Sequence, residues 1–215
     1  MKMLLRAVPL KNRLSDKFEE ASLFQGIDAD NLAHIEGRWR PMFEQRKLHA
    51  KTTGESLSEI NAEDAHWQWG KKMIAAVQDP FIFDIFVLEC AGNTQAIMLV
   101  RKGGEKCFSR HPDHLRAPLI YVDFLSTAPW NRPKLVSEPV YKGGGRILIS
   151  TAVSLSLNEE MQGRIGLHSL PGAEEFYLNQ IGMTDLGKDS DYGGLRYFEL
   201  SAPKAANFFI LPQQQ

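Results

Sequence analysis

Three consecutive glycines at positions 143–145 stand between two cationic residues, Lys142 and Arg146. An apolar run over residues 119–125 predicts a strand upstream, and an apolar pattern with helical period follows the glycines at once. Glycine lets the backbone approach a ligand closely and take positive φ, and the first N–H groups of a helix point outward without an intrahelical partner. The stretch therefore predicts an anion site built from backbone, to which Lys142 and Arg146 can add full charges.

The residues that follow the glycines exclude two other kinds of nucleotide-binding loop. A P-loop requires Lys and then Ser or Thr after its last glycine, but Gly145 is followed by Arg146 and Ile147. A dinucleotide-binding fingerprint requires a further glycine three residues on, where this chain has Leu148. Three glycines alone also fit a loop that merely connects two elements, so the flanking sequence has to decide between these interpretations.

The composition predicts one globular domain, or one domain with an elaboration. The chain has 215 residues, of which 43% are hydrophobic and 24% charged, and its net charge is −1. Nothing global indicates a nucleic-acid partner or an anionic membrane, and no apolar run approaches the roughly 18 residues of a membrane span. Arg6 and Pro9 interrupt a start that resembles a signal peptide. With two cysteines, Cys90 and Cys107, free thiols in a cytoplasmic protein are expected.

The N-terminal part is predicted to be mainly helical after one strand. Pro41 is expected to kink the second helix or to start a new one, since proline cannot donate the helical hydrogen bond. His66, Trp67 and Trp69 fall on the last helix of this part. The predicted elements are a strand over 2–8, helices over 15–24 and 28–48, a loop over 51–59, and a helix from Asn61 to just before Asp79.

From residue 81 the apolar period changes to that of strands. The resulting fold class is α+β, a three-layer arrangement in which helices flank both faces of a mixed, mostly antiparallel sheet. The C-terminal residues 212–215 are predicted to be disordered. The predicted elements are strands over 81–90 and 95–100 joined by a turn at 91–94, a strand over 119–127, a helix to about 158, a strand over 164–169, a helix from Pro171 to Gly182, and a strand over 195–200.

Two motifs and this element order carry a resemblance to a known family. Val140, Gly143 and Gly145 stand where a pyrophosphate loop reads Gln/Arg-x-x-Gly-x-Gly/Ala, so the first position departs and both glycines match. The segment 173–177 reads Ala-Glu-Glu-Phe-Tyr and is followed by Gly-Met at 182–183. With these features the chain resembles the GNAT superfamily of acetyl-CoA-dependent N-acetyltransferases.

The resemblance extends over residues 4–200, and bacterial members share a sequence similar to residues 163–171. It implies a single acyltransferase domain over 1–215. Within it, residues 1–80 would form the first strand and a helical acceptor-side region. Residues 81–200 would form the acyl-CoA-binding core, and 201–215 a C-terminal tail.

The implied activity is direct transfer of an acetyl group from acetyl-CoA, as co-substrate and without a metal, to a primary amine of a small molecule or peptide. Many family members pair into homodimers. The alternatives are a non-catalytic acyl-CoA-binding regulatory module and a toxin or effector that acetylates a macromolecular amine. The resemblance implies that the pantetheine arm meets backbone at Leu125, Ser126 and Thr127, and that the pyrophosphate meets Val140, Lys142, Gly143, Gly144, Gly145 and Arg146.

Acetyl transfer also needs a proton donor for the departing thiolate and a base for the amine. Tyr177 is the candidate acid, because a tyrosine hydroxyl keeps its proton at neutral pH. Asp123 and His168 are the candidate bases. For each of the three, a buried structural side chain with satisfied hydrogen bonds is the alternative.

The acceptor side is expected to include His66, Trp67 and Trp69, whose rings could stack on an acceptor. Packing of these rings in the core is the alternative. The resemblance places them on a helix that helps to wall the acceptor side.

Overall fold

The computed structural model describes residues 2–208, and the chain divides into two compact units. Of the described residues, the first unit holds 2–99 together with 125–148, and the second holds 100–124 and 149–208. The tail predicted to be disordered, 212–215, lies outside the described residues. Between residues 2 and 208, no helix is long and apolar enough to cross a membrane.

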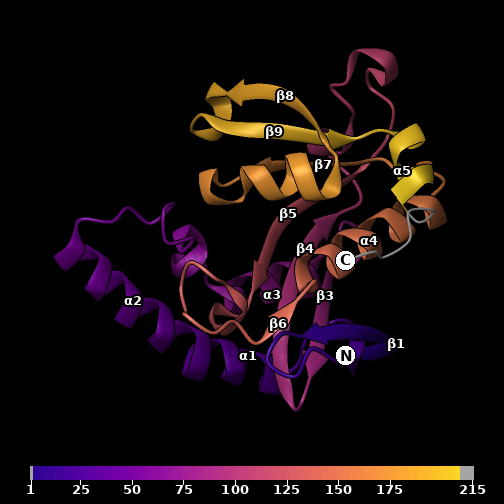
Figure 1. Cartoon of the computed structure of the whole chain (residues 1–215). Coiled ribbons are helices and arrows are strands. Elements are labelled where there is room, and N and C mark those ends of the chain that lie inside the picture. The colour runs from indigo at the N-terminus through magenta and orange to yellow at the C-terminus, as the bar shows by residue number, and fades with distance from the viewer. Residues whose placement is uncertain (1, 209–215) are drawn as a thin grey trace. The chain divides into compact units, whose positions relative to one another are not determined.

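The strands of the first unit are adjacent in the order β6-β1-β2-β3-β4. Figure 1 labels β1, β3, β4 and β6 among them. Antiparallel registers join β1 to β6, β1 to β2 and β2 to β3. The predicted turn between β3 and β4 is confirmed, with positive φ at Ala91 and Gly92. The bounds are β1 (Met3–Asn12), β2 (Phe18–Gln25), β3 (Phe83–Cys90), β4 (Asn93–Arg101) and β6 (Tyr141–Lys142).

The helix predicted over residues 15–24 is wrong, because this segment forms β2. Within it Ala21 and Leu23 are buried while Ser22 between them is only partly buried, which is the period of a strand. The backbone of β2 pairs with β1 on one side and β3 on the other, so pairing with its neighbours overrides the local helical spacing.

A helical region follows in the first unit, formed by α1 (Ala29–His34) and α2 (Arg40–Thr53). A π-helical turn over Ile35–Trp39 joins them, and the N–H of Arg40 donates to the carbonyl of Ile35. The next residue, Pro41, has no N–H to donate, so the predicted interruption at this proline is confirmed.

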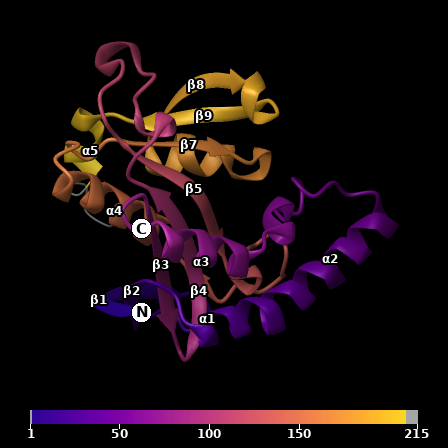
Figure 2. The ribbon, with the colours of Figure 1, turned by 180° about the vertical axis from the view of Figure 1, so that it is seen from behind.

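The single helix predicted from Asn61 is wrong. A 3₁₀ turn covers Glu63–His66, Trp67 and Gln68 are extended, and α3 (Trp69–Gln78) then begins. Asn61 has positive φ and does not cap a helix. Helix α3 packs against β3 (Figure 2).

The strands of the second unit are adjacent in the order β5-β7-β9-β8. The β5–β7 pairing is parallel and runs from Ile120–Ile165 to Val122–Leu167, whereas β7–β9 and β8–β9 are antiparallel. The predicted α+β class with mixed, mostly antiparallel strands is confirmed. The bounds are β5 (Ile120–Thr127), of which residues 120–124 belong to this unit, β7 (Ile165–Ser169), β8 (Thr184–Asp189) and β9 (Leu195–Leu200).

Strand β8 was not predicted, because its sequence is polar, contains Gly187 and pairs through an irregular register. Helix α4 (Gly144–Asn158) ends where predicted, and α5 (Ala202–Phe208) is an additional helix. After Pro171 a 3₁₀ turn and a π-helical segment, Phe176–Ile181, end at Gly182 in left-handed conformation. That stop agrees with the prediction.

Gly166 on β7 provides a test of packing in the second unit. A Cβ added there would lie 2.5 Å from the hydroxyl of Tyr197 and 3.2 Å from Leu119. We expect Gly166→Ala to lower the free energy of unfolding by about 1–3 kcal/mol through overpacking, measured by urea denaturation. Gly70→Ala in α3 is the matched control, since its Cβ meets nothing within 4 Å and alanine favours a helix by about 0.5–1 kcal/mol. Equal effects of the two substitutions would contradict this packing.

Candidate functional site

The glycine turn lies between a short strand and a long helix, as an anion site requires. Strand β6 pairs with β1 through Tyr141 and Lys142, Gly143 takes φ of +103°, and α4 begins at Gly144. The first helical bond runs from the N–H of Ile147 to the carbonyl of Gly143 at 3.0 Å. Only glycine adopts such a φ without strain, and the N-terminus of a helix favours negative charge.

The start of α4 lies close against the strands beneath it. A Cβ at Gly144 would be 3.5 Å from Ala96 and 3.6 Å from Leu88, which is ordinary contact with β4 and β3. The strand that leads into the turn is β6, whereas the sequence predicted the run that forms β5.

Hydrogen bonds fix the approach to the turn. The N–H of Val140 donates to Trp130 and its carbonyl accepts from Arg13, so the backbone of Val140 is used within the protein. The N–H of Tyr141 donates to Asn131 Oδ1 at 2.9 Å, and its hydroxyl donates to Glu19 at 2.7 Å. Burial and the Glu19 carboxylate raise the pKa of Tyr141, so the tyrosine remains a donor.

A buried ion pair that was not predicted from the sequence binds the end of β5. Ser126 is buried, and its hydroxyl donates to Asp64 at 2.6 Å. Asp64 receives two bonds from Arg132, at 2.7 and 2.6 Å, and Arg132 also donates to the carbonyl of Thr127. Burial opposes the charge of Asp64, but Arg132 and Ser126 together lower its pKa. A carboxylate between the apolar residues Ala62 and Ala65 was the available signal, because a buried charge needs a partner.

Tyr177 lies in the second unit, within the π-helical segment, and is 6% exposed. Its carbonyl accepts from the N–H of Met183 at 3.0 Å. Its ring meets Phe176 edge-on at 5.1 Å and lies 6.1 Å from the ring of Phe198. Aromatic packing therefore fixes the orientation of the candidate acid.

Both carboxylate oxygens of Asp123 are bound by cations. Oδ2 accepts from Arg101 at 3.0 Å, and Oδ1 lies 3.5 Å from Lys106. The side chain is 6% exposed. To accept a proton from a substrate, Asp123 would have to exchange one of these bonds.

His168 is enclosed by hydrogen-bonding and aromatic groups. Nε2 lies 2.9 Å from Asp189 and Nδ1 lies 2.6 Å from the hydroxyl of Tyr121, while Tyr192 stacks on the ring at 3.9 Å. The arrangement fits a neutral imidazole that donates from Nε2 to Asp189 and accepts at Nδ1. Burial lowers the pKa of His168, and the charges of Arg110 and Lys106 lower it further, against the hydrogen bond to Asp189.

One network joins the two candidate bases. Lys106 binds Asp123 and lies over the rings of Tyr121 and Tyr192, at 5.0 and 4.7 Å. The hydrogen bond from Arg110 holds the pKa of Asp189 at about 2. The basic residues Arg101, at the end of β4, and Lys106 and Arg110, in the β4–β5 loop, are thus bound to carboxylates of their own unit.

The three predicted acceptor-side residues differ in exposure. His66 is exposed, Trp67 is half-buried and Trp69 is 2% exposed. Trp67 meets His66 and Trp69 edge-on, with ring centroids 6.5 and 6.2 Å apart. Trp69 is therefore a core side chain, while His66 and Trp67 present ring surface to solvent.

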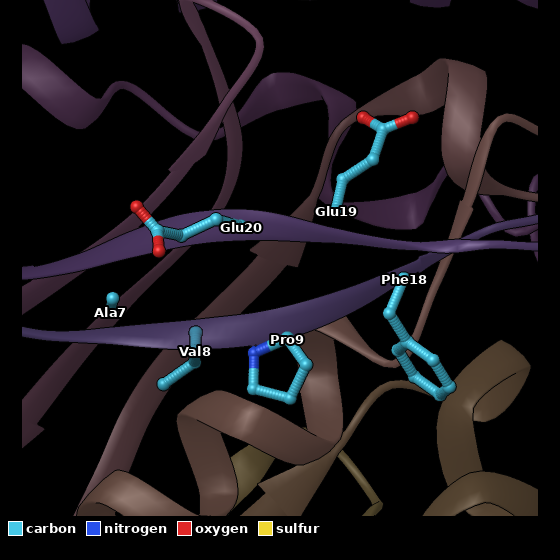
Figure 3. A pocket seen from close by; sticks show the side chains of 6 residues that line it. All are labelled: Ala7, Val8, Pro9, Phe18, Glu19 and Glu20. Carbon is cyan, nitrogen blue, oxygen red and sulfur yellow. The ribbon is translucent and has the colours of Figure 1, made fainter.

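A hollow of 310 Å³ lies elsewhere on the first unit, on the β1–β2 hairpin. Figure 3 shows the side chains that line it, which come from Ala7, Val8 and Pro9 of β1 and from Phe18, Glu19 and Glu20 of β2. None of the predicted site residues lines it. Within residues 2–208, no group of three or more His, Cys, Asp or Glu is arranged to hold a metal ion.

Comparison with known proteins identifies the fold. No family model matches the chain, and no curated protein matches its sequence. The GNAT domain of S. lividans PAT matches 91% of this chain and 95% of its own, at 13% identity and a TM-score of 0.53. This likeness confirms the expected GNAT-like fold, and at such an identity it shows the fold alone.

Two solved complexes are less similar by TM-score. Mycobacterium smegmatis RimJ in complex with CoA-disulfide covers 95% of this chain and 92% of its own, at 14% identity and a TM-score of 0.49. The PaiA N-acetyltransferase from Thermoplasma acidophilum, in complex with coenzyme A, covers 83% of this chain and 98% of its own, at 11% identity and a TM-score of 0.49.

The enclosure of His168 predicts a pH dependence of stability. Its folded pKa lies below the ordinary 6.5, so below that pH the unfolded chain binds a proton that the folded chain does not. The free energy of unfolding should therefore fall as pH drops from about 6.5 toward the folded pKa. Urea denaturation from pH 7.5 to 5 checks this, with His168→Gln losing part of that slope and His66→Gln, at an exposed position, retaining it. An unchanged slope in His168→Gln would contradict the assignment.

Proposed function

We propose that this chain, which has the GNAT fold, is a transferase that moves an acetyl group from acetyl-CoA to a primary amine. The observation that carries the proposal is the turn at Gly143, set at positive φ directly before the N-terminus of α4. Backbone N–H groups there suit the pyrophosphate of acetyl-CoA, with Lys142 and Arg146 beside them. The pantetheine arm would meet the backbone at Leu125, Ser126 and Thr127.

The reaction forms a bond from the amine nitrogen to the thioester carbonyl carbon and breaks the bond from that carbon to sulfur. Negative charge develops on the carbonyl oxygen, where fixed N–H dipoles near Leu125 to Thr127 would stabilise it. The proton lost by the amine passes to a base, and the departing thiolate takes a proton from Tyr177. Deprotonating an ammonium at pH 7 costs about 4 kcal/mol, which a positioned base can supply.

Asp123 and His168 remain the proposed bases. His168 has a lowered pKa and is therefore unprotonated at neutral pH, as a base must be. Asp123 is bound by Arg101 and Lys106, so it would accept the proton after exchanging one of these two bonds. The acceptor itself would approach His66 and Trp67, whose exposed ring surface suits a small molecule or peptide that carries an amine.

Tyr177→Phe tests both the activity and the proposed acid. With acetyl-CoA and a panel of primary amines, we expect the wild type to release free thiol, detected with a thiol reagent. The substitution should lower kcat about 100-fold or more without changing the Kd for CoA, because it removes only the hydroxyl. Loss of CoA binding in Tyr177→Phe would contradict the acid role. CoA binding by the wild type without thiol release on any amine would instead indicate an acyl-CoA-binding module.

Gly143→Ala tests the cofactor site. A side chain is strained at a φ of +103°, so relaxation of the turn should raise the Kd for CoA about tenfold, measured by calorimetric titration. Gly54→Ala is the matched control, since Gly54 also has positive φ and open surroundings but ends α2. It should lose comparable stability and keep the wild-type Kd. Equal affinity of Gly143→Ala and wild type would place the pyrophosphate elsewhere.

A further inference from the structure

Arg132 uses its whole guanidinium group inside the first unit. Nε donates to the carbonyl of Thr127 at 3.0 Å, and Nη1 donates to the carbonyl of Asn61 and to Asp64, both at 2.7 Å. Nη2 contacts Asp64 at 2.6 Å, Thr127 at 2.7 Å and Ser126 at 3.0 Å. The planar group also lies over the ring of Phe43, at 4.9 Å. A lysine ammonium could not make these contacts together, because it carries one nitrogen.

The peptide that follows Thr127 is held from two sides. Its carbonyl accepts from Arg132, and its N–H, which belongs to Ala128, donates to the carbonyl of Gln95 at 2.9 Å. The preceding residue, Ser126, is tied to Asp64 through its side chain. The end of β5 therefore has a fixed direction, and dipoles fixed in advance are what stabilises charge in a transition state.

The same loop also holds the approach to the glycine turn. Trp130 and Asn131 donate from their side chains to Gln95 Oε1, each at 2.9 Å. Asn131 Oδ1 then accepts the N–H of Tyr141, and the carbonyl of Trp130 accepts the N–H of Val140 at 3.0 Å. Residues 130–132 thus contact both the end of β5 and the residues just before Gly143.

We propose that Arg132, paired with Asp64, is a positioning residue that sets the pantetheine-binding end of β5 and the pyrophosphate turn relative to each other. This proposal rests on the proposed function. Through Asp64 and the carbonyl of Asn61, Arg132 also holds the 3₁₀ turn that precedes Trp67. One side chain therefore links the acyl-CoA contacts to the acceptor-side residues.

A purely structural role would not require this arrangement. Buried ion pairs contribute little net stability compared with apolar side chains of similar volume, so stability alone does not explain the choice of Arg and Asp. Both side chains are enclosed, at 6% exposed for Arg132 and 5% for Asp64. What this pair supplies is direction, because a bidentate guanidinium fixes the angle as well as the distance of each partner.

Arg132→Lys tests the proposal, because it keeps the charge and removes the fork. The matched control is Arg46→Lys. In the wild type, the guanidinium of Arg46 makes a bidentate pair with Glu55 near the end of α2, with both distances 2.9 Å. Each protein is titrated with CoA by calorimetry. Amide hydrogen exchange is followed by mass spectrometry over residues 125–128 and 140–146, with β8 and β9 of the second unit as an internal reference.

We expect Arg132→Lys to raise the Kd for CoA at least tenfold and to speed exchange in both segments, with exchange in β8 and β9 unchanged. Arg46→Lys should match the wild type in both measurements. A folded Arg132→Lys with a Kd within twofold of wild type and unchanged exchange would overturn the proposal.

Ser126→Ala keeps the test informative if Arg132→Lys does not fold. It removes one hydroxyl of the network and should speed exchange over 125–128 and raise the Kd for CoA about threefold; wild-type values for both would overturn the proposal. If the wild type binds no CoA, the proposed function fails. Exchange then still decides whether Arg132 orders the two segments, since faster exchange in both supports positioning and unchanged exchange contradicts it.

Discussion

The buried ion pair of Arg132 and Asp64 constrains the end of β5 in the first unit. Two charges removed from water must satisfy each other and their remaining hydrogen bonds, and here carbonyls of Asn61 and Thr127 and the hydroxyl of Ser126 complete the set. The 61–64 and 126–132 segments, which are far apart in the sequence, consequently have one mutual arrangement. The approach to the glycine turn depends on the same loop, through its bonds to Val140 and Tyr141.

In the second unit, too, carboxylates with little exposure are satisfied by partners, and more charged groups take part. Asp123 and Asp189 pair with Lys106 and Arg110 of the β4–β5 loop, and Glu199 accepts from the hydroxyl of Ser109 in the same loop. These carboxylates hold the loop to the strands. His168 lies among them as a neutral ring between Asp189 and Tyr121. A network of this kind fixes the orientation of its members, and the low pKa of His168 is a direct consequence of that enclosure.

Features set by local sequence were predictable, and features set by distant contacts were not. Gly143 and Gly182 lie at positive φ, as the turn and the helix end that they were expected to form require. The helix after the glycines ends at the expected residue. A helix was predicted where β2 lies because the spacing of its apolar residues fits both a helix and a strand, and only pairing with β1 and β3 decides between them. The hydrogen bonds of Arg132 could not be predicted from the sequence because its partners lie up to 71 residues away.

We propose that the three glycines at 143–145 bind the pyrophosphate of acetyl-CoA. Titration of ¹⁵N-labelled protein with CoA, followed by amide chemical shifts, tests it most directly. We expect the amide signals of Gly143, Gly144 and Gly145 to shift together and saturate with added CoA, and the amide signals of residues 46–53 in α2 to stay unchanged. Saturable shifts confined to other segments, or no shifts at all, would contradict it.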